Sequence, residues 1–331
     1  MLDNSKIIDL IQGFDKYKVL IIGDVMIDSY MWGKVERISP EAPVPVLTSQ
    51  NRENRLGGAA NVALNILSLG ATPILCSVIG DDEHGVLFKE LMKEKNLVTE
   101  GLLVDTDRKT TIKTRVISEH QHLLRIDEED SMNLSSIMED AFVKHTLSII
   151  CKKQVDAIIF EDYDKGVITP LVIENIVAMA NKMGIPTLVD PKKRNFSAYK
   201  NVTLFKPNFK ELSEGLKMDL RKNDPENIHS ATERLHKDLH IDYVMVTLSE
   251  MGVLISEDGT YKAIPAHKRD ITDVSGAGDT VISTASLCMV SGMAPEEIAC
   301  ISNLAGGIVC EKTGVVPIEK EQLIEEVKKL S

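Results

Sequence analysis

The sequence predicts an α/β fold with a mostly parallel central sheet, helices on both faces and a small antiparallel β lid. Short continuous apolar runs end in polar or glycine-bearing loops, which is typical of strands buried on both faces. From residue 134 onward helical and strand patterns alternate, which favours parallel pairing. Two further pairs of β-like segments do not fit that sheet. We expect one domain over residues 1–331, with lid segments at about 29–50 and 109–127.

The elements of the core follow from these patterns in chain order. Residues 19–22 are apolar and end at Gly23, as in a buried parallel strand. Asp258-Gly259 predicts the turn of an edge hairpin. The expected strands are 19–22, 74–79, 157–160, 186–189, 202–205, 243–248, 253–255 and 261–264, and the expected helices include 1–18, 87–95, 281–293 and 320–331.

The lid is predicted from two β-like pairs, 30–35 with 44–48 and 110–117 with 122–126. Pro43 and Pro45 fit edge strands, because proline cannot donate a hydrogen bond to a neighbouring strand. Residues 119–121 form the expected turn of the second pair. A lid beside the core would exclude water from a reaction.

Composition excludes several classes of function. The chain has 50 acidic against 38 basic residues and a formal net charge of −12, which disfavours nucleic acid and anionic membranes as partners. The polar N-terminus does not resemble a signal peptide, and the apolar runs are too short to span a membrane. The five cysteines are scattered in apolar segments without a Cys-x-x-Cys pair. We therefore expect a cytoplasmic protein with reduced thiols.

A small-residue turn at 273–280 enters the apolar run at 281–293. Gly276 and Gly278 permit backbone angles that direct several free N–H groups, including that of Ala277, to one spot at the start of a helix. The helix dipole makes this spot suitable for a phosphate. Asp279 lies inside it, where a carboxylate fits the role of a general base. The alternative is an ordinary helix cap.

Three other stretches each have a functional interpretation and a purely structural one. Gly57 and Gly58 allow close approach of a ligand to a helix start, or serve tight helix packing. The basic run that begins at Lys192 could hold a phosphate or be a solvated loop. Asn208 and Glu211 could order water around Mg²⁺, or form a capping pair.

Together these motifs resemble the ribokinase (PfkB) family of sugar kinases over essentially the whole chain. The motifs are the Gly-Gly-Ala-Ala-Asn at 57–61, the Asn-x-x-Glu at 208–211 and the glycine turn at 273–279. Residues 37–46, 113–116, 121–127, 162–166, 190–192 and 248–252 further resemble the D-glycero-β-D-manno-heptose 7-phosphate kinases of lipopolysaccharide core synthesis. Val274 departs from the family pattern, which often has Thr after the first Asp of the turn.

The resemblance implies a role for each matching residue. Asp279 would be the catalytic base, with the N–H groups of Gly276, Ala277 and Gly278 as an anion hole. Asn208 and Glu211 would serve Mg²⁺ through water. The implied sugar contacts are Asp24, Asp28, Gly57, Gly58, Asn61 and Asp162, the implied contacts for a substrate phosphate are Lys113, Arg115 and Lys192, and the implied nucleotide contacts are Asn208, Glu211, Ser249, Glu250, Gly252 and Asn303.

The implied activity is ATP- and Mg²⁺-dependent phosphorylation of the anomeric hydroxyl of that heptose phosphate, with a monovalent-cation requirement left open. We also expect a homodimer through the lid. The two-domain relatives carry a nucleotidyltransferase half, which we expect to be a separate protein here. The alternatives are a kinase for fructose 1- or 6-phosphate and a non-catalytic sugar-binding relative.

Overall fold

A nine-stranded sheet forms the centre of the computed structural model, which describes residues 3–119 and 121–330. The strand order is β13-β12-β11-β10-β9-β8-β1-β4-β5, parallel from β11 to β5, with β12 and β13 adding an antiparallel hairpin at the edge. The predicted mostly parallel sheet is confirmed. The strands are β1 (Lys18–Gly23), β4 (Thr72–Gly80), β5 (Leu102–Asp105), β8 (Ala157–Glu161), β9 (Thr187–Asp190), β10 (Leu204–Phe205), β11 (Tyr243–Thr247), β12 (Val253–Glu257) and β13 (Thr260–Ile264).

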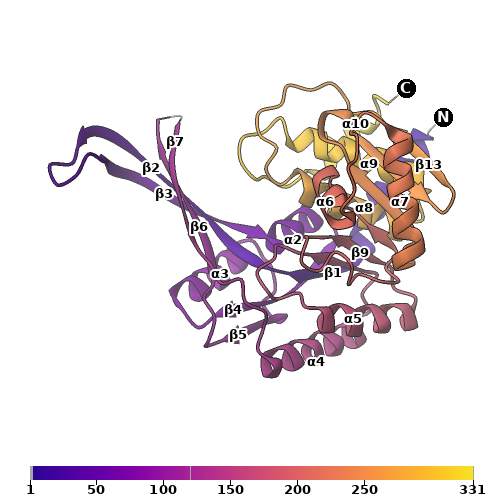
Figure 1. Cartoon of the computed structure of the whole chain (residues 1–331), viewed down its shortest axis with the longest axis horizontal. Helices are drawn as coiled ribbons and strands as arrows, with labels where there is room; N and C mark the ends of the chain where they lie inside the picture. Colours follow the sequence, from indigo (N-terminus) through magenta and orange to yellow (C-terminus); the bar gives the residue numbers. More distant parts are fainter. Residues whose placement is uncertain (1–2, 120, 331) are drawn as a thin grey trace.

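Helices cover both faces of this sheet (Figure 1). One buried apolar cluster takes side chains from α1 (Asn4–Gln12), α2 (Ala59–Ser68), α3 (Glu83–Glu94), α8 (Ala277–Val290), α9 (Pro295–Val309) and α10 (Lys320–Val327). The other takes them from α4 (Ser136–Lys153), α5 (Pro170–Met183), α6 (Phe209–Leu216) and α7 (Pro225–Leu239). Along β1, Ile21 enters the first cluster and Ile22 the second, as the two-residue period of a strand requires. Short 3₁₀ turns occur at η1 (Gly13–Lys16) and η2 (Ser249–Met251).

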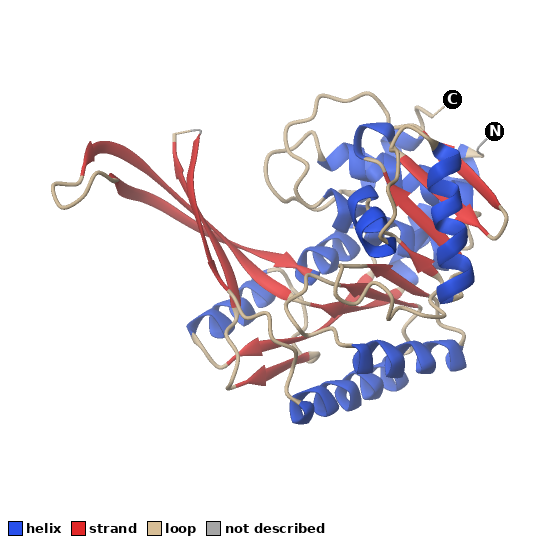
Figure 2. Cartoon of the chain, in the orientation of Figure 1, coloured by secondary structure: helices blue, strands red, loops and turns tan. Residues whose placement is uncertain are grey.

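The lid is a second sheet in the order β3-β2-β6-β7. Its strands are β2 (Val25–Ile38), β3 (Pro45–Gly58), β6 (Thr111–Ser118) and β7 (Gln121–Glu128), and residue 120 in the predicted turn lies outside the described residues. The hairpins β2–β3 and β6–β7 are antiparallel, and a parallel pairing of β2 with β6 joins them. Figure 2 shows their far ends extending away from the core.

The first lid segment is longer at its base than the predicted 29–50. Strand β2 begins at Val25, directly after β1, and β3 runs on to Gly58. The buried Val25, Ile27 and Leu56 continue the core into the base of the lid, so the strand pattern does not stop where the polar residues begin. Asp28 and Gly57 therefore lie on lid strands, at the junction with the core.

Two further findings concern membrane-spanning helices and the cysteines. Among the helices of residues 3–119 and 121–330, none has the length and apolar character that crossing a membrane requires. All five cysteines are free thiols; Cys76, Cys288, Cys300 and Cys310 are buried, as the sequence predicts, whereas Cys151 is exposed.

Candidate active site

The glycine turn places Asp279 in the first turn of α8. Gly276 caps this helix with φ of +79°, in the left-handed region that glycine favours. A Cβ on Gly276 would lie 3.0 Å from Nδ2 of Asn61. The carboxylate of Asp273 accepts hydrogen bonds from the N–H of Ser275 and the N–H of Gly314, and so fixes the turn against the loop that follows α9.

Asp279 is buried, and both oxygens of its carboxylate accept hydrogen bonds. Nδ2 of Asn61 donates to Oδ2 at 2.6 Å, and the hydroxyl of Tyr163 donates to Oδ1 at 2.9 Å. Burial raises the pKa of Asp279 to about 6; the hydrogen bond from Asn61 opposes this rise and the charge of Asp190 adds to it. At neutral pH the group is thus an ionised carboxylate that accepts a proton more readily than an exposed aspartate.

The predicted anion hole is partly used within the turn itself. The N–H of Ala277 donates a long hydrogen bond of 3.3 Å to the carbonyl of Val274. Gly278 presents a bare Cα on the other side, where a Cβ would lie 3.5 Å from Asp190 and 3.7 Å from Nζ of Lys206. The start of α8 therefore faces a lysine as well as the dipole of its own helix.

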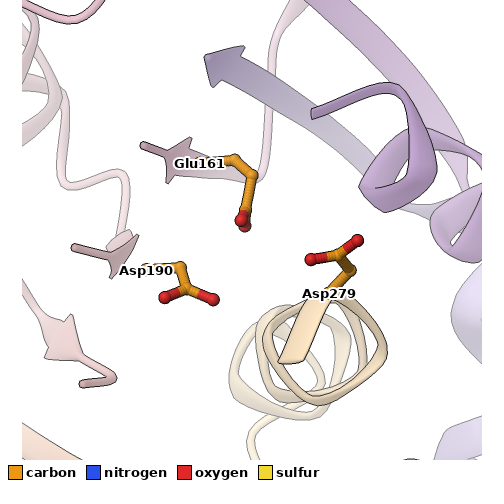
Figure 3. Close-up of side chains that lie close together, drawn as sticks. All are labelled: Glu161, Asp190 and Asp279. Carbon is orange, nitrogen blue, oxygen red and sulfur yellow. The ribbon is translucent and has the colours of Figure 1, made fainter. Parts of the chain in front are cut away.

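Three carboxylates converge at this point from three elements. Figure 3 shows Glu161 at the end of β8, Asp190 at the end of β9 and Asp279 on α8 pointing toward one another. One oxygen of each lies within 4.8 Å of the others. Oε2 of Glu161 is buried without a hydrogen-bond partner among the described residues. Burial, together with the charges of Asp190 and Asp279, raises the pKa of Glu161 well above its usual value.

Two lysines offset this negative charge. Nζ of Lys206, only 2% exposed, lies 2.7 Å from Oδ2 of Asp190. Burial alone would lower the pKa of Lys206, but Asp190 and Glu161 outweigh it and the pKa is raised. Nζ of Lys192 pairs with Oε1 of Glu211 and lies 5.7 Å from the ring centre of Tyr163. The basic residue predicted at 192 thus lies at the site, although a carboxylate already holds it.

The predicted magnesium pair forms a capping box at the start of α6. The N–H of Glu211 donates to Oδ1 of Asn208, and the N–H of Asn208 donates to Oε2 of Glu211, both at 2.9 Å. The capping alternative is therefore present, and it leaves Oε1 of Glu211 turned toward Lys192. A role for the pair with Mg²⁺ stays a prediction.

On the lid side, Asp28 lies beside the predicted glycines. Its Oδ1 is 2.5 Å from Nη1 of Arg115, which pairs the two residues across β2 and β6. A Cβ on Gly57 would lie 2.2 Å from Oδ2 of Asp28, so only glycine leaves room for this carboxylate. Gly58 caps α2 with φ of +61°, three positions before Asn61, which contacts Asp279.

The predicted sugar contacts Asp24 and Asp162 accept hydrogen bonds from within the chain, and their contact with a sugar stays a prediction. Asp24 is buried and accepts hydrogen bonds from the N–H groups of Tyr163, Lys165 and Val167. Asp162 accepts from Nδ2 of Asn195, from the hydroxyl of Tyr199 and from the N–H of Asp164. Both carboxylates fix the loop after β8, because a buried charge requires such donors.

The predicted phosphate contact Lys113 is paired as well. Its Nζ lies 3.0 Å from Asp127 and 2.7 Å from Glu129. Lys113 and Arg115 share one face of β6, as their spacing predicts. Each of these cations faces a carboxylate of the same chain, so an anionic ligand would have to compete with it.

The predicted nucleotide contacts lie around residues 264–266. A Cβ on Gly252, whose φ is +90°, would lie 2.1 Å from the carbonyl oxygen of Ile264. Nδ2 of Asn303 donates to the carbonyl of Pro265. Ser249 and Glu250 form η2, and Glu250 pairs with Lys222. Gly252, which follows η2, and Asn303 of α9 thus approach the same segment, 264–265, although they lie about 50 positions apart in sequence.

The sequence reasoning did not assign four residues that the structure brings to Asp279: Tyr163, Glu161, Asp190 and Lys206. Each stands at or just after the carboxyl end of a parallel strand, where ligands bind in open α/β sheets. That signal was present in the sequence, since all four lie one to three positions after the expected strands 157–160, 186–189 and 202–205.

Comparison with known proteins agrees with this geometry. The model of the pfkB family of carbohydrate kinases matches residues 16–321. The bifunctional protein HldE of Citrifermentans bemidjiense is 37% identical over 94% of this chain and 63% of its own length. HldE of Helicobacter pylori strain J99 is 38% identical over 92% of this chain and 65% of its own length. The chain therefore spans slightly less than two thirds of the length of these curated relatives.

Among solved structures, ribokinase of Arabidopsis thaliana complexed with ribose and ATP superposes with a TM-score of 0.71. The two share 17% sequence identity over 95% of this chain and 99% of that one, which shows the common fold. The fold and the site together define a phosphotransferase that acts on a sugar. The chain belongs to the pfkB family of carbohydrate kinases.

Proposed function

We propose that this kinase transfers the γ-phosphoryl group of ATP to the anomeric hydroxyl of D-glycero-β-D-manno-heptose 7-phosphate, giving the 1,7-bisphosphate in ADP-heptose synthesis. The observation that carries the proposal is a buried carboxylate, Asp279, in the first turn of α8, together with Lys113 and Arg115 on one face of lid strand β6. The motifs shared with heptose 7-phosphate kinases and the 37–38% identity to HldE proteins support the choice of sugar.

Asp279 acts in this proposal as the general base. Its carboxylate takes the proton of the attacking hydroxyl, while Asn61 and Tyr163 hold it in position. Burial beside Asp279 raises the pKa of Tyr163 well above its usual value, so the phenol keeps its proton and donates. The start of α8 and Lys206 are already in place for the charge on the transferred phosphoryl oxygens, which is the larger part of the rate effect.

The residues present fit a divalent cation, because Oε2 of Glu161 is buried without a partner beside two further carboxylates. Asn208 and Glu211 would hold Mg²⁺ through water, with carboxylate oxygens of the cluster nearby. When bound, Mg²⁺ neutralises charge on the nucleotide phosphates. We propose a cytoplasmic location, in keeping with the free buried thiols.

The pH dependence of turnover tests the role of Tyr163. Because the pKa of Asp279 is raised to about 6, we expect kcat to fall as the pH drops through about 6. Tyr163→Phe removes a hydrogen bond that lowers the pKa of Asp279. The pKa should therefore rise, and kcat of the Phe variant should begin to fall at a higher pH than kcat of the parent protein. A pH profile of kcat for both proteins measures the shift. An unchanged pH profile in the Phe variant would assign Tyr163 a packing role instead.

Arg115→Ala tests the lid side of the site. The change removes the partner of the buried Asp28 and a cation of the sugar-facing surface, with an expected loss of about 2–5 kcal/mol in binding of the sugar phosphate. KM for heptose 7-phosphate should rise far more than KM for ATP. Equal KM values for the sugar phosphate in the variant and the parent protein would contradict the assignment.

The lid also supports a proposed homodimer. Apolar side chains on its far ends are exposed, among them Ile38, Val44, Leu124 and Ile126. A thin sheet cannot bury both of its faces alone, so we expect two lids to pack together. Light scattering at micromolar concentration should give twice the mass of the chain. Leu124→Glu should shift it toward the monomer, and a monomeric parent protein would rule out this interface.

A further inference from the structure

One carboxylate holds two lysines between the lid and the core. Oε2 of Glu129 lies 2.7 Å from Nζ of Lys113 on β6, and its Oε1 lies 2.7 Å from Nζ of Lys165 in the loop after β8. All three side chains are largely shielded, with 14%, 26% and 19% exposure for Lys113, Glu129 and Lys165. Asp127 also contacts Lys113, but it is shared with Arg125. Two shielded ammonium groups thus converge on one singly charged group.

The position of this cluster relative to Asp279 defines what it could bind. Tyr163 contacts Asp279, and Lys165 follows two residues later in a loop that Asp24 fixes through three backbone N–H groups. Asp164 between them has φ of +58°, so the loop bends there, and the N–H groups of Tyr163 and Lys165 both donate to Oδ2 of Asp24. Lys113 is the register partner of Asp28 on β2, so its side chain stands on the same face of the lid as that carboxylate.

We propose that Lys113 and Lys165 bind the phosphate group that the sugar substrate already carries, and that Glu129 occupies their site in the free enzyme. This inference rests on the proposed function, since it requires a sugar phosphate as substrate. It adds Lys165 to the cations assigned to the substrate phosphate, beside Arg115, whose guanidinium pairs with Asp28.

Charge and position explain why a substrate phosphate would displace Glu129 from the two lysines. A phosphate monoester carries about two negative charges at neutral pH and three acceptor oxygens, so it matches two ammonium groups better than one carboxylate does. Glu129 stands between the end of β7 at Glu128 and the start of α4 at Ser136, outside any helix or strand. Its side chain can leave the lysines without breaking a backbone ladder. Binding of the sugar phosphate would then join the lid to the core through both lysines.

Two substitutions with opposite expected effects test the proposal. Glu129→Gln keeps the shape and removes the competing charge, so KM for the sugar phosphate should fall about 3- to 10-fold. Lys165→Met should raise that KM about 10- to 100-fold, and Lys165→Arg should recover most of the loss. KM for ATP should change less than about twofold in all three. The matched control is Lys153→Met at the end of α4, which breaks an exposed ion pair with Glu100. It should leave the KM values for the sugar phosphate and for ATP unchanged.

The assay uses the full chain and measures ADP release with each of four sugars: heptose 7-phosphate, fructose 6-phosphate, fructose 1-phosphate and unphosphorylated heptose. If heptose 7-phosphate reacts but Lys165→Met leaves its KM unchanged, the phosphate site is wrong and the proposed function stands. If Glu129→Gln raises KM, Glu129 positions the lysines and does not compete. If another sugar phosphate reacts instead, the proposed sugar is wrong, and the variants test the site on that substrate. Reaction with free heptose alone would overturn both proposals.

Discussion

Asp279→Asn is expected to lower kcat about 10²- to 10⁴-fold while ATP still binds. The substitution keeps the size of the side chain and its place between Asn61 and Tyr163, but an amide cannot take the proton of the attacking hydroxyl. Turnover under saturating substrates, with ATP binding measured separately by calorimetry, checks both parts. Near-normal turnover by the Asn variant would remove Asp279 from the role of base.

The same variant should also change how the stability of the protein depends on pH. Because the pKa of Asp279 is raised in the folded state, the folded protein binds more protons than the unfolded chain between pH 3.8 and about 6. Ionisation of this group therefore costs stability as the pH rises through that window. The stability of Asp279→Asn relative to the parent protein should increase from pH 4 to pH 7, as measured by urea unfolding. A constant difference would mean that the pKa of Asp279 is not raised.

Lys206→Met is expected to destabilise the protein by about 3–5 kcal/mol, because it leaves the buried Asp190, beside Glu161 and Asp279, with only the more distant Lys192 at 3.8 Å as a cation. The melting temperature should fall by roughly 5–15 °C in a calorimetric scan. Turnover should fall as well, since the start of α8 loses its nearby positive charge.

Two controls separate this effect from the loss of an ordinary ion pair. Arg234→Met breaks an exposed i, i+4 pair with Asp238 on α7 and should cost less than about 1 kcal/mol. Adding Asp190→Asn to Lys206→Met removes the poorly compensated charge of Asp190 and should recover part of the stability. If the double variant is no more stable than Lys206→Met, electrostatic compensation is not what Lys206 provides.

The fold was predictable because its signals are local. Residues 19–22 are apolar on both faces, and this identifies a parallel strand without knowledge of its neighbours. The base of the lid was harder to predict, because the polar Asp24 after the end of β1 indicates a loop, whereas β2 begins at Val25 without a break. The short strand β5 was missed, since four residues at a sheet edge carry little periodicity.

The site was predictable where a motif fixes its own geometry and less so where distant segments meet. The turn at 273–279 identified Asp279, because the glycines and the helix start lie within a few positions of it. Its partner Asn61 lies 218 positions away, and the sequence assigned that residue to the sugar instead. The hydrogen bonds of Asp24 with the loop after β8 could not be predicted from spacing, because backbone N–H groups leave no mark in a sequence. Those of Asp162 could not be predicted either, because their donors Asn195 and Tyr199 lie more than 30 positions away.

Phosphorus NMR of the product formed from heptose 7-phosphate and ATP tests the proposed chemistry most directly. We predict a second phosphate on the anomeric carbon, identified by its coupling to the anomeric proton, in step with the appearance of ADP. The Asp279→Asn protein should form this product at least about 100-fold more slowly. A phosphate on another carbon, or ADP release with free phosphate and no bisphosphate, would contradict the assignment of this site to the anomeric hydroxyl.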